Sequence, residues 1–140
     1  MRIKRTVEKL VNQYKTRNPY EIADRMGILV QKNRLGGIRG YYLLYSGIKC
    51  ICINSEIKDI HTEYTVMAHE LGHSVMHEEE RCMFFENTFY DKNKYEVQAN
   101  RFAAELLIPD SIIYENPGMT KSQLSQLTGY DERLIGFKKL

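Results

Sequence analysis

Two histidines stand four residues apart in the segment His69-Glu70-Leu71-Gly72-His73. Four residues of an α-helix rise about 6 Å and return to nearly the same face, so both imidazoles can bind one tetrahedral Zn²⁺ ion. Glu70 lies about 100° further around such a helix, where its carboxylate can reach an attacking water without being a ligand. The segment therefore predicts a zinc site in which Glu70 activates water.

A catalytic zinc site needs a third protein ligand, and three ligands leave one tetrahedral position open for water and substrate. His77 continues the histidine row, but it lies about 12 Å along a regular helix from His69, too far to share the ion. His61 fails for the same reason unless the chain before the helix folds back. Glu96 is a better candidate because we expect it in the first turn of the next long helix. Taken alone, however, an acid at that position is more often solvated.

Two helices should carry these residues. We expect the first to begin at Thr62 as its N-cap and to end between His77 and Glu80. One apolar row with four-residue spacing supports it: Met67, Leu71 and Val75. The second should run from Tyr95 to Leu107, and the aperiodic residues 80–93 predict a loop between the two. Small residues on the second helix would allow a close approach: Ala99, Ala103 and Ala104.

The remaining helices and strands should pack around these two helices. An apolar stripe predicts a helix from Ile3 to Tyr14, and Asn18-Pro19 predicts the start of another that Gly27 can end. Three β-branched and aromatic runs predict a small three-stranded sheet: residues 28–31, 38–45 and 48–54. Ser46-Gly47 should join the last two runs in a tight antiparallel hairpin. With two short C-terminal helices, residues 119–127 and 131–138, these elements predict an α+β fold.

Composition limits the classes of protein that the sequence allows. The chain has 140 residues, of which 43% are hydrophobic and 27% charged, so we expect residues 1–140 to form a single domain. A net charge of +2 is too small for the electrostatic footprint of a nucleic-acid-binding protein. No apolar run approaches the roughly 20 residues of a membrane span, and the first residues do not resemble a signal peptide. We therefore expect a cytoplasmic protein that binds neither membrane nor nucleic acid.

The three cysteines also favour the cytoplasm. Cys50, Cys52 and Cys82 are odd in number and lack the paired spacing of zinc ribbons and redox sites. We therefore expect reduced thiols. Cys50 and Cys52 should point to the same side of a strand, as small core residues do.

Two segments, residues 68–73 (AHELGH) and 96–109 (EVQANRFAAELLIP), resemble the motifs of the ImmA/IrrE family of metallopeptidases. The resemblance implies a zincin-like core with a gluzincin-like ligand set for one Zn²⁺ ion per chain: His69, His73 and Glu96. It also implies that Glu70 is the general base. Gln98 stands where many relatives have Glu. Because Gln98 is neutral, Glu96 is the only carboxylate available at the start of its helix.

Members of this family known as anti-repressors occur on prophages and integrative elements, and are associated with cleavage of a helix-turn-helix repressor encoded nearby. The resemblance therefore implies a site-specific endopeptidase whose partner is a protein substrate, a transcriptional repressor of this kind. Zn²⁺ would polarise the scissile carbonyl while Glu70 takes a proton from water and delivers it to the departing amine. Tyr41, Tyr90 and Tyr95 are conceivable donors to the oxyanion, and the sequence favours none of them.

Two other functions fit part of the sequence. In a non-catalytic module, zinc would only staple two helices while the surface sequesters a regulator, and loss of Glu70 would then be tolerated. Alternatively, residues 119–138 could bind DNA, because residues 123–130 resemble half of a helix-turn-helix. Two helices without a supporting third are short for that motif, and the near-neutral charge argues against phosphate binding.

Overall fold

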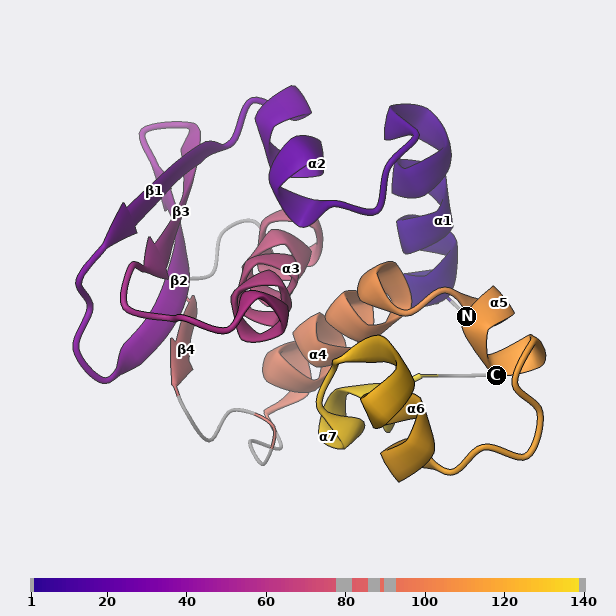
Figure 1. Ribbon diagram of the computed structural model, residues 1–140. Coiled ribbons are helices and arrows are strands. Elements are labelled where there is room, and N and C mark those ends of the chain that lie inside the picture. The colour runs from indigo at the N-terminus through magenta and orange to yellow at the C-terminus, as the bar shows by residue number, and fades with distance from the viewer. Residues whose placement is uncertain (1, 78–81, 86–88, 90–92, 139–140) are drawn as a thin grey trace.

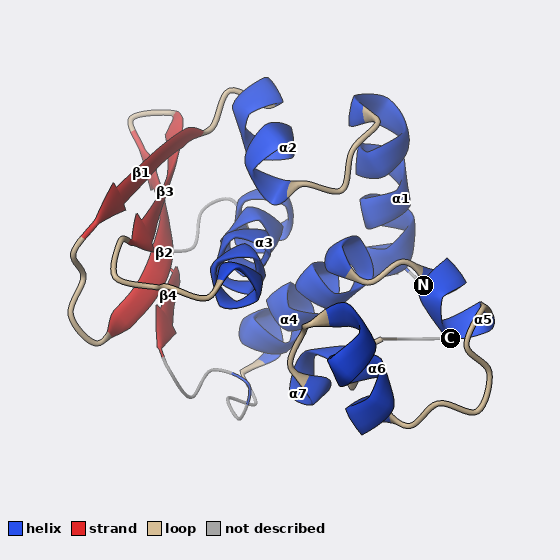
Figure 2. Cartoon of the chain, viewed as in Figure 1, coloured by secondary structure: helices blue, strands red, loops and turns tan. Residues whose placement is uncertain are grey.

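The computed structural model describes residues 2–77, 82–85, 89 and 93–138, with residues 82–85 described by their backbone. A mixed sheet lies on one side of α3, and α4 lies on the other (Figures 1 and 2). In chain order the elements are α1 (Arg2–Tyr14), α2 (Pro19–Arg25), β1 (Leu29–Asn33), β2 (Ile38–Tyr45), β3 (Ile48–Asn54), α3 (Ile60–Met76), β4 (Cys82–Phe85), α4 (Lys94–Leu107), α5 (Asp110–Tyr114), α6 (Lys121–Thr128) and α7 (Glu132–Ile135).

The strand order in the sheet is β1-β3-β2-β4. β2 and β3 form the predicted antiparallel hairpin, in which Tyr45 pairs with Ile48. The turn between them requires positive φ at both central residues, 49° at Ser46 and 77° at Gly47, as two-residue hairpins commonly do. β1 pairs with β3 in parallel, and β2, which lies between them in the chain, runs antiparallel to β3. The α+β class and the three predicted strands are confirmed.

Sequence reasoning missed two elements and misplaced one helix cap. The loop predicted over residues 80–93 contains β4, which pairs antiparallel with β2 and makes the sheet four-stranded. Four residues are too few to show a period, and β4 is stabilised by a strand distant in the chain. α5, with five residues, is also short. Asp59, rather than Thr62, caps α3: its carboxylate accepts hydrogen bonds from the Thr62 backbone N–H at 2.9 Å and hydroxyl at 2.8 Å.

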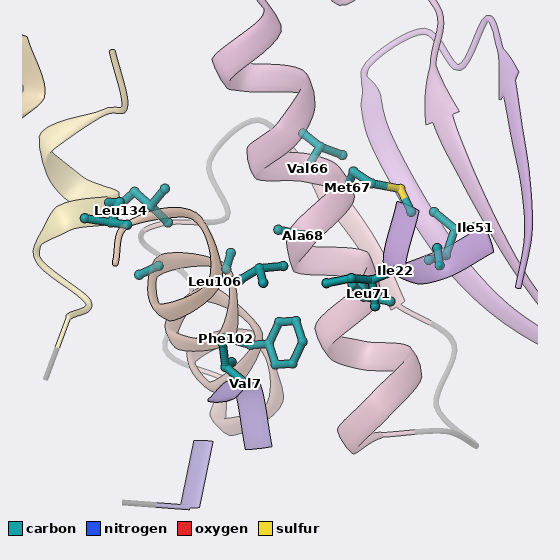
Figure 3. Close-up of a cluster of buried hydrophobic side chains, with 14 of the residues drawn as sticks. Val7, Ile22, Ile51, Val66, Met67, Ala68, Leu71, Phe102, Leu106 and Leu134 are labelled. Carbon is teal, nitrogen blue, oxygen red and sulfur yellow. The ribbon is translucent and has the colours of Figure 1, made fainter. Parts of the chain in front are cut away.

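The core lies between the sheet, α3 and α4 (Figure 3). Residues 65–74 of α3 are all buried, because the helix is covered by the sheet on one side and by α4 on the other. Met67 and Leu71 of α3 pack near Ile51 of β3 and Ile22 of α2, and Phe102 of α4 lies on the side of α3 that faces α4. Within the described residues, no helix combines the length and the apolar character that a membrane span requires.

β2 lies close against α3 at Gly40. A Cβ atom at this position would lie 2.8 Å from Cγ1 of Val66 and 3.0 Å from the backbone oxygen of Cys52. Neither atom can move away freely, since Val66 is buried in α3 and the oxygen belongs to β3. Gly40 therefore sets the distance between the sheet and the helix that carries the histidines.

We predict that Gly40→Ala lowers the free energy of unfolding by about 1–3 kcal/mol, because the added methyl group overpacks the contact between sheet and helix. Gly37→Ala is the matched control: a Cβ atom there would meet nothing within 4 Å. We expect the control to change stability by less than about 0.5 kcal/mol. Urea denaturation followed by circular dichroism measures both, and equal stability of the two variants would show that the close approach is unimportant.

Candidate metal centre

Three side chains from two helices converge at the interface of α3 and α4. His69 and His73 lie one turn apart on α3, and Glu96 lies in the first turn of α4. One carboxylate oxygen of Glu96 is 2.9 Å from Nε2 of His69, and the other is 3.0 Å from Nε2 of His73. The two Nε2 atoms are 3.2 Å apart. One ligand atom from each residue thus lies within 4.8 Å of the others, a spacing that could hold a metal ion.

The chemistry of this cluster fits a divalent transition metal. Two imidazoles and one carboxylate are a common ligand set of catalytic zinc, and three ligands leave a coordination position open. Both histidines are fully buried and Glu96 is 9% exposed, so the ligands are held within packed structure. Among the described residues, His61 and His77 are not part of this group of possible ligands.

The carboxyl group of Glu96 has the charge that an anionic metal ligand needs. Burial raises the pKa of its carboxyl group, but the hydrogen bonds and the charges of His69 and His73 outweigh burial and hold the pKa well below its usual range. Asn93 caps α4 by accepting a hydrogen bond from the Tyr95 backbone N–H at 2.9 Å, which places Glu96 within the first turn. The carboxylate therefore stays charged at neutral pH and faces both imidazoles.

Glu70 is buried beside this cluster without being part of it. Its side chain is fully buried, and among the described residues neither carboxylate oxygen has a hydrogen-bond partner. Burial raises the pKa of Glu70 well above its usual range, and the negative charge of Glu96 raises it further. A buried carboxyl group without a hydrogen-bond partner lowers the stability of the fold. The position of Glu70 beside three potential ligands is therefore better explained by a chemical role than by a contribution to stability.

The second ring nitrogens of both histidines are also occupied. Nδ1 of His69 lies 2.7 Å from Oδ1 of Asn100, a buried residue one turn after Glu96 on α4. Nδ1 of His73 lies 3.0 Å from Nδ1 of His77. Such contacts orient imidazole ligands toward a metal. Sequence reasoning assigned no role to Asn100, although its four-residue spacing from Glu96 places both on one face of the helix.

The other candidate residues lie elsewhere. The ring of His61 packs edge-to-face on Tyr130 at 4.8 Å, and both line a cavity of about 260 Å³ between α3 and the C-terminal helices. Tyr95 packs on His77 with ring centroids 4.6 Å apart. Tyr41 lies on β2 opposite Cys52 of β3, and Tyr90 lies outside the described residues. Cys50 and Cys52 are free thiols.

Comparison with known proteins gives three similarities. A family model described as the IrrE N-terminal-like domain matches residues 23–130. A protein of Bacillus phage phi105 named "Uncharacterized immunity region protein 2" is 37% identical over 142 residues, which cover 99% of this chain and 89% of the phage protein. "Metallopeptidase ImmA" of Bacillus subtilis (strain 168) is 31% identical over 137 residues, which cover 88% of this chain and 75% of that protein.

We predict that alanine at position 69, 73 or 96 removes most of the bound metal, because two donors cannot replace a three-ligand site. His77→Ala should retain about one equivalent per chain when metal is supplied in excess, because His77 contacts His73 but lies outside the group of three possible ligands. Elemental analysis after gel filtration measures the ratio of metal to protein. Loss of metal from His77→Ala together with retention in Glu96→Ala would show that the ligand set is wrong.

Proposed function

The chain belongs to the ImmA/IrrE family of metallopeptidases, and from this premise we propose that it is a zinc-dependent, site-specific endopeptidase that inactivates a helix-turn-helix transcriptional repressor. The observation that carries the proposal is the burial of the Glu70 carboxyl group beside the convergent side chains of His69, His73 and Glu96. We further propose that residues 1–140 act as one domain in the cytoplasm.

In this proposal each residue of the centre has a defined task. His69, His73 and Glu96 would hold one Zn²⁺ ion, with two Nε2 atoms and the carboxylate as ligands. When bound, the ion supplies Lewis-acid polarisation of a peptide carbonyl and makes an attacking water more acidic. Glu70 accepts the proton of that water at its carboxylate and delivers it to the departing amine. Burial makes the ionised carboxylate of Glu70 a stronger base, and the same carboxyl group can hold the proton between the two steps.

The same carboxyl group distinguishes catalysis from a purely structural metal site. A non-catalytic module that uses zinc as a staple gains nothing from an isolated acid within its core, and such an acid destabilises the fold. Structural zinc sites also tend to use four protein ligands, whereas three candidate ligands converge among the described residues. These features favour the enzyme over the sequestering module.

Support for a repressor as the substrate comes from the relatives. The phage protein is named for an immunity region and the Bacillus subtilis protein is named a metallopeptidase. We propose that this chain is a metallopeptidase that acts in immunity control by cutting a transcriptional regulator of a mobile element. The C-terminal helices do not favour DNA binding instead, because α7 has only four residues, about one turn, too short for a recognition helix.

We predict that Glu70→Gln retains the fold and the metal but reduces cleavage at least about a hundredfold, because the amide cannot accept the proton of water. The assay is co-expression with the helix-turn-helix repressor encoded nearest to this gene, with fragments identified by mass spectrometry. Glu115→Gln, a change at an exposed residue, is the control and should cleave like the wild type. An intact repressor in the presence of zinc-loaded wild type, or normal inactivation by Glu70→Gln, would refute the proposal.

A further inference from the structure

A chain of side-chain contacts leads from His73 across to α4. Nδ1 of His73 lies 3.0 Å from Nδ1 of His77, and Nε2 of His77 lies 2.7 Å from Oε1 of Gln98. The two histidines are one turn apart at the end of α3, and His77 is 7% exposed. Gln98 lies two residues after Glu96, so α4 contacts both ring nitrogens of His73, one directly and one through His77.

We infer that Gln98, acting through His77, is a positioning residue that fixes the tautomer of His73. The inference rests on the proposed function in one respect, namely that Nε2 of His73 binds the metal. A neutral imidazole carries one N–H hydrogen and one lone pair, and a metal ligand must present the lone pair. His73 therefore carries its hydrogen on Nδ1 and donates it to Nδ1 of His77.

The remaining hydrogens follow from this first one. Because Nδ1 of His77 accepts, the hydrogen of a neutral His77 lies on Nε2, and the amide oxygen of Gln98 accepts it. The reverse arrangement, in which the amide group of Gln98 donates, would put a hydrogen on Nδ1 of His77 and another on Nε2 of His73. His73 could then not bind a metal without changing tautomer. The orientation of one amide group thus selects between a binding and a non-binding form of a ligand.

The other histidine ligand is fixed by the same chemistry at a different residue. Nδ1 of His69 lies 2.7 Å from the amide oxygen of Asn100, so its hydrogen lies on Nδ1 and its lone pair on Nε2. Asn100 and Gln98 are two residues apart on α4. Both imidazoles are therefore oriented by amide oxygens of one helix, directly for His69 and through an intervening imidazole for His73.

The amide group of Gln98 does not fix the tautomer of His77 completely, because the amide can rotate by 180° and donate a hydrogen bond instead. A carboxylate at position 98 would only accept, so of the two tautomers of a neutral His77 it would stabilise the productive one. Gln98→Glu should therefore tighten zinc binding several-fold. Gln98→Leu removes the acceptor at nearly constant volume and should weaken binding about 10–100-fold, the usual cost of losing such a partner.

The experiment measures the zinc dissociation constant of each variant by competition with a chelator of known affinity. Gln126→Leu is the matched control, because Gln126 is exposed on α6, and it should bind like the wild type. In parallel, long-range ¹H–¹⁵N NMR of the zinc-loaded wild type should show hydrogen on Nδ1 of His73 and on Nε2 of His77. The thermal unfolding of each metal-free variant shows whether the change affects folding instead.

The possible outcomes separate this inference from the proposed function. Zinc bound at one equivalent, with hydrogen on Nδ1 of His77 or with equal affinities for Gln98→Leu and Gln126→Leu, would overturn the inference and leave the zinc site intact. A wild type that binds no zinc would overturn both. Weakened binding in Gln98→Leu and tightened binding in Gln98→Glu would support the inference, since a purely structural role does not predict opposite changes.

Discussion

The close packing of α3 against α4 is the constraint on which the rest of the structure depends. Glu96 can face both histidines only where the two helices nearly touch. Gly72, which lies between the histidines, permits this approach, because a Cβ atom there would lie 3.0 Å from the side chain of Phe102. On α4, Ala99 and Ala103 are small and fully buried, so they leave room for a close approach. Along each helix, small residues therefore lie between the polar residues of the site: Gly72 lies between His69 and His73, and Ala99 lies between Glu96 and Asn100.

That packing buries polar groups, which is tolerable only when each finds a partner. On α3, His69, His73 and Ser74 each have such hydrogen-bond partners. Each imidazole uses one nitrogen toward the ligand cluster and the other toward a side chain outside it. Ser74 donates to the backbone oxygen of Leu71 at 2.7 Å. Glu70 departs from this pattern among the described residues, and it is the residue to which the proposed chemistry assigns the proton.

How much the sequence predicts depends on how local the cause is. The pair His69 and His73 follows from helix periodicity alone, and the hairpin turn follows from Ser46-Gly47. The role of Glu96 is ambiguous from the residues alone, because its partners come from another helix, and it is the family resemblance that favours Glu96 as a ligand. β4 depends on pairing with a distant strand, and the contact of His77 with Gln98 depends on how two helices meet. Neither leaves a periodic signal along the chain.

Ion pairs at the C-terminal end of α4 help to hold its N-terminal end, which carries Glu96, in position. Glu105 pairs with Lys138 at 2.7 Å, and the side chains of both are only 3% exposed. Lys138 also binds Asp110 at 2.6 Å, and Lys4 of α1 binds Asp110 at 2.9 Å. A buried ion pair adds little net stability, but loss of one partner leaves an uncompensated charge. The network therefore penalises displacement of α4 relative to α1, α5 and Lys138. Because a helix is stiff, holding its last turns also constrains the first turn, where Glu96 meets the histidines.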